Sequence, residues 1–269
     1  MTDGDAGDPV GEVAPEAGPG ADDADAAPEG MPAHEDPEPD PGGVPTGCAG
    51  IDDLLGDGLE RGTVTQVYGP PAAGKTNVAL SAAIATAATG ATVVYIDTEG
   101  LSADRFRQIA SGCADPDVVA DRIVISEAHD FDEQAEAVQD VADLAGRADL
   151  VVLDSATGFY RLKRTQDAEG EALRRVARQV AHLLSLARKH DLAVLVTNQV
   201  YTDPDSDGIR PLGGHTLAHW TGVILRLDRF RGGNRRATLE KHRSKAAGET
   251  IQFRITDAGL AADDTGPPP

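Results

Sequence analysis

The sequence contains few cysteines and no long apolar run, and these shortages exclude several classes of protein. Cys48 and Cys113 form neither a CxxC pair nor a zinc-ligand spacing, so we expect no disulfide framework and no zinc site. The most apolar window, residues 78–96, is interrupted by Thr, Ser and Gly90, which predicts a helix followed by a strand and not a membrane span. The acidic N-terminus lacks the apolar segment of a secretory signal peptide. We therefore expect a cytoplasmic protein with no membrane partner.

Positive charge is also scarce. The chain carries 24 Lys and Arg against 45 Asp and Glu, which gives a formal net charge of −21, and only five of the basic residues are Lys. An acidic, lysine-poor surface suits very high salt, where ions screen the repulsion between carboxylates. An ordinary acidic protein with a charged tail is the alternative. The shortage of Lys extends through the whole chain, so we expect a halophilic protein.

Negative charge is concentrated in residues 1–42, which contain thirteen acidic residues and no Lys or Arg. Such a segment cannot bury a hydrophobic core, so we expect a disordered acidic tail. Met31 lies inside this segment, and a translation start at Met31 is an alternative. Residues 43–260 have a length that suits one α/β domain, and residues 261–269 predict a short disordered end.

Between these ends the chain alternates strand-like and helix-like segments. Strands are predicted at 63–68, 92–97, 122–126, 150–154 and 192–196. Helices are predicted at 75–88, from Ser102 or Asp104 to Gly112, at 130–146 and at 169–190. This alternation predicts an α/β fold with a mostly parallel sheet flanked by helices. Three further strands, at 221–228, 235–242 and 250–256, predict an antiparallel extension at the C-terminus.

A glycine-rich segment lies where the first predicted strand meets the first predicted helix. It matches the phosphate-binding pattern GxxxxGK[ST] and consists of Gly69, Pro70, Pro71, Ala72, Ala73, Gly74, Lys75 and Thr76. Glycines let backbone N–H groups turn toward phosphates, and the helix N-terminus adds its dipole. Lys75 is expected to reach the β- and γ-phosphates, and the Thr76 hydroxyl is expected to hold Mg²⁺. The sequence therefore predicts binding of ATP with Mg²⁺.

Polar residues stand at the ends of three other predicted strands. Asp154 closes an apolar strand and is the candidate for holding Mg²⁺ through water. Glu99 is the candidate general base for an attacking water, and Gln199 can hydrogen-bond the γ-phosphate. Each residue taken singly has an alternative role. Asp154 could be a helix cap, Glu99 a solvated loop glutamate and Gln199 an ordinary loop amide. Because the carboxyl ends of parallel strands share one crevice, we expect all three to converge on Lys75.

The order of these motifs resembles the RecA superfamily of recombination ATPases over residues 47–259. The matching segments are Thr46-Gly47-Cys48, Ile51 to Leu55, Gly58, the phosphate loop, Tyr95 to Gly100, Leu150 to Ser155, Thr197 to Val200, Gly213-Gly214-His215 and Leu217-Ala218-His219. The resemblance implies a RecA-type ATPase core in which Glu99 is the catalytic glutamate. It also implies that Arg105 stacks on the adenine of ATP.

Two parts of the larger recombinases of this superfamily are not visible, namely the helical N-terminal DNA-binding domain and the Phe-x-x-Ala polymerisation motif. The chain therefore resembles the short archaeal members. This resemblance implies an accessory protein of DNA repair and homologous recombination that binds ATP and DNA, hydrolyses ATP weakly and does not drive strand exchange alone. It further implies a homo-oligomer, with the recombinase RadA or a Holliday-junction resolvase as candidate partners.

Two loops project toward the filament axis in this superfamily and bear on DNA binding. The first contains Arg161, Lys163 and Arg164 beside Phe159 and Tyr160, a combination that can grip phosphates and stack on unpaired bases. A solvated helix start is the alternative. The second, residues 201–210, has three Asp and one Arg and is a poor DNA surface. High salt weakens contacts made through counterion release, so we expect weak to moderate affinity for single-stranded or branched DNA.

A basic string follows on the C-terminal strands. Its members are Arg226, Arg229, Arg231, Arg235, Arg236, Lys241, Arg243 and Lys245. Strand alternation puts Lys241 and Arg243 on one face, and KaiC-like members of the superfamily use a similar Lys-x-Arg as catalytic fingers on a neighbouring subunit's phosphates. A charged edge strand is the alternative, and the rest of the string is a candidate DNA surface. A KaiC-like regulatory ATPase without a DNA role and a nucleotide-gated, non-catalytic adaptor for repair proteins are therefore the alternative functions.

Overall fold

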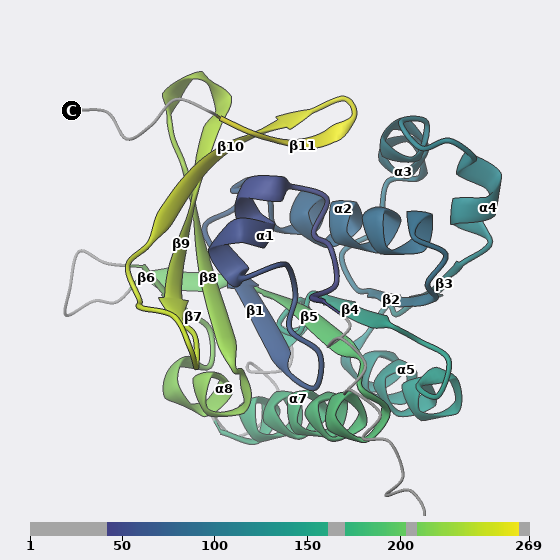
Figure 1. The fold of residues 1–269 in the computed structure, drawn as a ribbon. Coiled ribbons are helices and arrows are strands. Elements are labelled where there is room, and N and C mark those ends of the chain that lie inside the picture. Colours follow the sequence, from purple (N-terminus) through teal and green to yellow (C-terminus); the bar gives the residue numbers. More distant parts are fainter. Residues whose placement is uncertain (1–41, 161–169, 203–208, 264–269) are drawn as a thin grey trace, which may run out of the picture. The chain divides into compact units, whose positions relative to one another are not determined.

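The computed structural model of the protein describes residues 42–160, 170–202 and 209–263. A nine-stranded sheet in the order β11-β10-β9-β8-β1-β5-β4-β2-β3 forms its centre (Figure 1). The strands of this sheet are β1 (Val64–Tyr68), β2 (Val93–Asp97), β3 (Ile123–Glu127), β4 (Leu150–Asp154), β5 (Ala193–Asn198), β8 (Val223–Arg229), β9 (Asn234–Lys241), β10 (Thr250–Thr256) and β11 (Gly259–Ala262). The α-helices are α1 (Ala49–Leu55), α2 (Lys75–Ala88), α3 (Ala103–Ala110), α4 (Pro116–Ala120), α5 (Phe131–Leu144), α7 (Glu171–His190) and α8 (Gly214–Trp220). A separate hairpin consists of β6 (Val200–Thr202) and β7 (Ile209–Pro211).

The sheet has a parallel part and an antiparallel part. From β8 to β3 all neighbouring strands pair in parallel, whereas β9, β10 and β11 pair antiparallel. Strands β1, β2 and β4 are buried along their whole length because helices cover both faces of the sheet. Helices α1 and α2 pack on one face, and α5, α7 and α8 pack on the other (Figure 1). The predicted α/β fold with C-terminal antiparallel strands is confirmed.

Local sequence signals set several helix ends. Helix α2 has the predicted bounds, beginning directly after the phosphate loop. Ser102 caps α3, since its side chain accepts the backbone N–H of Arg105. Asp130 caps α5 by accepting the N–H groups of Asp132 and Glu133. These starts follow from the capping chemistry that the sequence displays.

Several short elements were not predicted from the sequence, namely α1, α4, α8, β6, β7 and β11. Strand β11 extends past residue 260, where the sequence predicted the domain to end. It pairs with β10 through Ala262, and the N–H of Asp263 donates to the Gln252 carbonyl at 2.9 Å. Ordered structure thus continues beyond residue 260. Gly and Ala do not favour strands, so pairing with β10 and not propensity forms this strand.

The remaining parts of the two predicted tails, residues 1–41 and 264–269, lie outside the described residues. Within the part of the chain that the structure describes, no helix has the length and apolar character needed to cross a membrane.

Candidate nucleotide-binding site

The phosphate loop connects β1 to α2, and both of its glycines are required by the structure. A Cβ atom on Gly69 would lie 2.3 Å from the carbonyl oxygen of Leu227 on β8. Gly74 has φ +107°, a conformation that residues with a side chain rarely adopt. Gly74 is also the N-cap of α2 and supplies no side-chain acceptor to the first N–H groups of that helix. These N–H groups and the helix dipole favour an anion at the loop.

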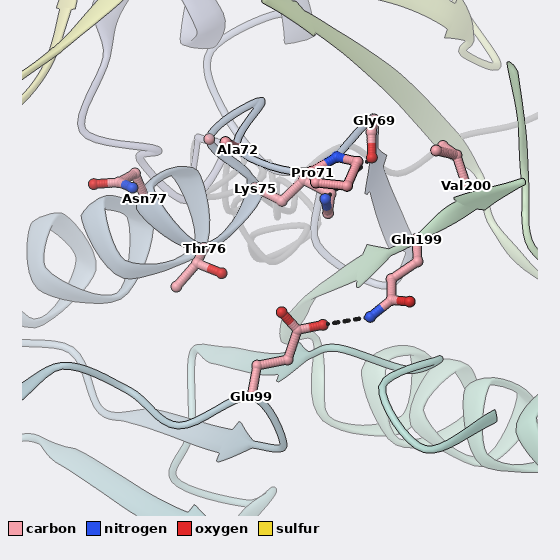
Figure 2. A pocket seen from close by; sticks show the side chains of 10 residues that line it. Gly69, Pro71, Ala72, Lys75, Thr76, Asn77, Glu99, Gln199 and Val200 are labelled. Atoms are coloured by element: carbon pink, nitrogen blue, oxygen red, sulfur yellow. Dashed lines mark hydrogen bonds between the residues drawn. The ribbon is translucent and has the colours of Figure 1, made fainter. Parts of the chain in front are cut away.

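The loop faces a pocket of about 370 Å³ (Figure 2). Glu99 reaches the pocket from the end of β2, and Gln199 reaches it from the end of β5. The residues that line the pocket are Gly69, Pro71, Ala72, Gly74, Lys75, Thr76, Asn77, Glu99, Gln199 and Val200. The structure therefore brings Glu99 and Gln199 together with Lys75, Thr76 and four other predicted residues of the phosphate loop. Their roles toward a ligand stay predictions.

Lys75 lies folded against the loop that precedes it. Its Nζ donates to the carbonyl oxygens of Gly69, at 3.1 Å, and Pro70, at 3.3 Å. Burial lowers the pKa of Lys75, while the nearby carboxylates of Glu99 and Asp154 act in the opposite direction. This half-buried ammonium, which among the described residues bonds only neutral carbonyls, is suited to exchange them for a charged phosphate.

Asp154 at the end of β4 is 1% exposed and is surrounded by hydroxyl donors. The Tyr95 hydroxyl donates to Oδ2 at 2.9 Å, and the Thr197 hydroxyl donates to Oδ1. The nearby Thr76 hydroxyl also favours the ionised form of Asp154 and so acts to lower its pKa. Burial outweighs these bonds and raises the pKa of Asp154 above its usual value.

The neighbouring oxygens of Thr76 and Asp154 fit a Mg²⁺ ion that is bound together with phosphates. Mg²⁺ usually keeps several waters and takes only one or two protein groups when substrate phosphates supply other ligands. A cation beside Asp154 would also offset the burial that disfavours its ionised form. The donor set is thus compatible with the predicted metal site.

Glu99 is held by two donors on one oxygen. Its Oε1 accepts from Ser155 Oγ at 2.8 Å and from Gln199 Nε2 at 2.9 Å, the second of which is drawn in Figure 2. Ser155 is fully buried, and its N–H donates to the Thr98 hydroxyl at 2.8 Å. Glu99 Oε2 receives no hydrogen bond from the described residues, so it is the oxygen available to a further partner.

Two residues of this network were not predicted, Ser155 and Asp97. The carboxylate of Asp97 accepts the N–H groups of Glu99, at 3.1 Å, and Gly100, at 3.0 Å, and so shapes the turn that carries Glu99. Ser155 follows Asp154 directly, but nothing in that position indicates a bond to a residue on another strand. Both residues lie near the two predicted carboxylates and within segments that match the RecA superfamily, and these were the available signals.

Arg105 lies at the edge of the pocket. Its Nε donates to Asn77 Oδ1 at 2.9 Å, and Asn77 lines the pocket. Its Nη2 donates to the carbonyl of Thr256 at 2.8 Å, and its Nη1 donates to that of Asp257 at 3.3 Å. The guanidinium of Arg105, which projects from α3, is therefore fixed between α2 and the β10–β11 turn, and stacking on adenine stays a prediction.

The structure does not bring Lys241 and Arg243 to the pocket of their own chain. Lys241 Nζ donates to the carbonyls of Ala218 and Thr221, both at 2.7 Å, and Arg243 forms an ion pair with Glu60. The predicted DNA-binding residues Arg161, Lys163 and Arg164 lie outside the described residues.

Comparisons with known proteins identify relatives of this chain. The Rad51 family model matches residues 43–263. The chain is 66% identical over 226 residues to the DNA repair and recombination protein RadB of Halobacterium salinarum, which covers 81% of this chain and 96% of the relative. It is 42% identical over 215 residues to the RadB protein of Methanococcoides burtonii, covering 79% of this chain and 95% of the relative. A crystal structure of the RadB recombinase aligns with a TM-score of 0.71 and 36% identity, over 82% of this chain and 100% of that chain.

These relatives bear on two of the predictions. The relative from Halobacterium salinarum is a haloarchaeal protein, which agrees with the halophilic character that we inferred from the composition. All three are RadB proteins, and the comparisons give no support to a KaiC-like regulator. Since the family match includes the phosphate loop and every strand end around the pocket, the chain belongs to the Rad51 family and groups within it with the archaeal RadB proteins.

Proposed function

We propose that this chain is an ATP-binding accessory protein of DNA repair and homologous recombination. One observation carries the proposal. Around a single phosphate loop, Thr76 lies beside Asp154 and Glu99 is hydrogen-bonded to Gln199, in a chain that matches the Rad51 family over residues 43–263. The relatives are named as DNA repair and recombination proteins, which supports the proposed process. The residues of the pocket support the proposed binding of ATP.

In this proposal Lys75 exchanges the loop carbonyls for the β- and γ-phosphates of ATP, and Thr76 and Asp154 hold Mg²⁺. The metal, when bound, neutralises negative charge on the phosphates. Glu99 Oε2 accepts the proton of an attacking water while Ser155 holds Oε1. Gln199 donates one N–H of its Nε2 to the same Oε1, which leaves the second N–H of that amide for the γ-phosphate. We expect slow hydrolysis, as the resemblance to the short archaeal members implies.

DNA binding is the second part of the proposal. Arg161, Lys163 and Arg164 remain the candidates in the first loop on the grounds given by the sequence. The turn between β8 and β9 supports a second surface, because Arg229 is exposed there beside Phe230, which is 40% exposed. A cation next to an accessible aromatic ring suits unpaired nucleotides. We propose weak binding that falls with rising salt.

Assembly and partners complete the proposal. Lys241 and Arg243 are proposed to act on the phosphates of a neighbouring subunit, for which they must leave Ala218, Thr221 and Glu60. The recombinase RadA and a Holliday-junction resolvase are the proposed partners. We place this function in the cytoplasm, and the two free cysteines support a reducing compartment.

The proposal is tested by binding and turnover in parallel, with and without DNA, in molar KCl. Lys75→Ala should abolish ATP binding while leaving the fold intact. Glu99→Gln should bind ATP like the wild type but hydrolyse it at least about tenfold more slowly, since general bases contribute about 10²- to 10⁴-fold. Wild-type turnover in Glu99→Gln would show that Glu99 is not the base. ATP binding with no turnover under any condition would favour the nucleotide-gated adaptor.

A further inference from the structure

An arginine from a distant strand lies directly against the phosphate loop. A Cβ atom built on Gly74 would meet Arg235 Nε at 3.2 Å and Arg235 Cδ at 3.3 Å, with Ile255 Cδ1 at 3.0 Å. Gly74 lines the pocket, so the stem of Arg235 packs at the edge of the predicted nucleotide site. Sequence pattern does not indicate this contact, because β9 reaches the loop through the antiparallel part of the sheet.

The guanidinium of Arg235 forms no ion pair with any carboxylate of the described residues. Its Nε is buried and finds no hydrogen-bond acceptor among the described residues, while Nη1 donates to the carbonyl of Gly233. Arg229 lies directly opposite on β8 and adds a second positive charge. Burial and the charge of Arg229 both lower the pKa of Arg235. Within the described ranges, neither arginine has a carboxylate partner.

We propose that Arg235 is a further nucleotide-binding residue, whose guanidinium hydrogen-bonds the α- and β-phosphates held by the loop. The inference rests on the proposed ATP-binding function. Backbone N–H groups of a phosphate loop cradle the α- and β-phosphates, and Gly74 is part of that cradle. A phosphate there supplies the acceptor that Arg235 Nε lacks and offsets the repulsion from Arg229. The planar fork of arginine matches two phosphate oxygens at once.

This role differs from that proposed for Lys75. The ammonium of Lys75 is directed to the β- and γ-phosphates, so its contribution depends on the γ-phosphate. Arg235 packs against the Gly74 end of the loop and should contribute equally to ATP and ADP. The alternative is that Arg235 is inhibitory. Its side chain would then occupy the space that the phosphates need and weaken nucleotide binding.

The test compares two variants that remove the same charge from neighbouring positions of β9. Arg235→Met keeps an unbranched stem against Gly74 and Ile255 but removes the guanidinium. Arg236→Met is the matched control, because the Arg236 guanidinium lies over the Phe230 ring at 4.5 Å from its centroid. Dissociation constants for fluorescent ATP and ADP analogues with Mg²⁺ are measured at one fixed KCl concentration. Melting temperatures without nucleotide verify folding. If Arg235→Met fails to fold, Arg235→Gln replaces it, and Arg236→Gln is then the matched control.

Arg235→Met should weaken ATP and ADP binding about tenfold or more, as expected for loss of a charge-assisted hydrogen bond, and Arg236→Met should change neither by more than about twofold. Unchanged or tighter binding in Arg235→Met, with binding lost in Lys75→Ala, would overturn the role of Arg235 alone. Equal weakening in Arg235→Met and Arg236→Met would also overturn it, because general charge would then explain the loss. Wild-type binding by Lys75→Ala would overturn the proposed nucleotide site and this inference together.

Discussion

Replacing Tyr95 by Phe removes one hydroxyl from a fully buried site and measures how Asp154 is stabilised. Tyr95 is 0% exposed, and its hydroxyl donates to Asp154 Oδ2 at 2.9 Å. A hydrogen bond to a charged group contributes about 1.5–3 kcal/mol, and the ring itself is kept. We expect Tyr95→Phe to lower the free energy of unfolding by that amount near neutral pH. For a domain of this size the melting temperature should fall by roughly 3–12 °C.

The loss should depend on pH because the acceptor is an ionisable group. Burial raises the pKa of Asp154, so the folded chain binds this proton more tightly than the unfolded chain. The resulting stability is fully present below the ordinary pKa of Asp and is lost as pH rises through the folded-state pKa. Tyr95→Phe removes an interaction that lowers this pKa, so the pKa should rise further. The difference between the variant and the wild type should therefore be largest near neutral pH and smaller in acid.

The measurement is reversible unfolding at one KCl concentration, at about pH 5 and about pH 7.5, within a double-mutant cycle with Asp154→Asn. In the Asp154→Asn background no charged acceptor remains, so Tyr95→Phe should cost less than about 1 kcal/mol. Equal losses at both pH values and in both backgrounds would refute the reasoning. Such a result would show that the hydroxyl stabilises the core independently of the Asp154 charge.

Two further predictions concern the tail and assembly. A chain that starts at Gly42 should melt and bind ATP like the full chain, because a uniformly acidic segment buries no core; a large decrease in melting temperature on truncation would contradict this. The double variant Lys241→Ala, Arg243→Ala should bind ATP nearly normally but hydrolyse it more slowly, since a cation supplied in trans affects rate more than affinity. Mixing the double variant with Lys75→Ala protein should restore some activity. If proven mixed oligomers show no recovery, Lys241 and Arg243 have no catalytic role and are only charged surface residues.

The sequence alone predicted the parts of this site that depend on local pattern and on the rules of parallel sheets. The phosphate loop is recognisable because its glycines and lysine have fixed spacing, and its placement between β1 and α2 followed from the flanking strand and helix signals. Glu99 and Gln199 could be placed together without a structure because parallel strands end on the same side. Capping chemistry likewise gave the starts of α3 and α5.

The tertiary structure decided which side chains touch across the sheet. The bond from Ser155 to Glu99 joins the ends of β4 and β2, and the packing of Arg235 on Gly74 joins β9 to the phosphate loop. Strand β11 exists through pairing with β10 although its residues do not favour strands. Periodicity and motif spacing report only a residue's near neighbours along the chain. Contacts between distant segments depend on register, twist and packing, which the folded chain fixes as a whole.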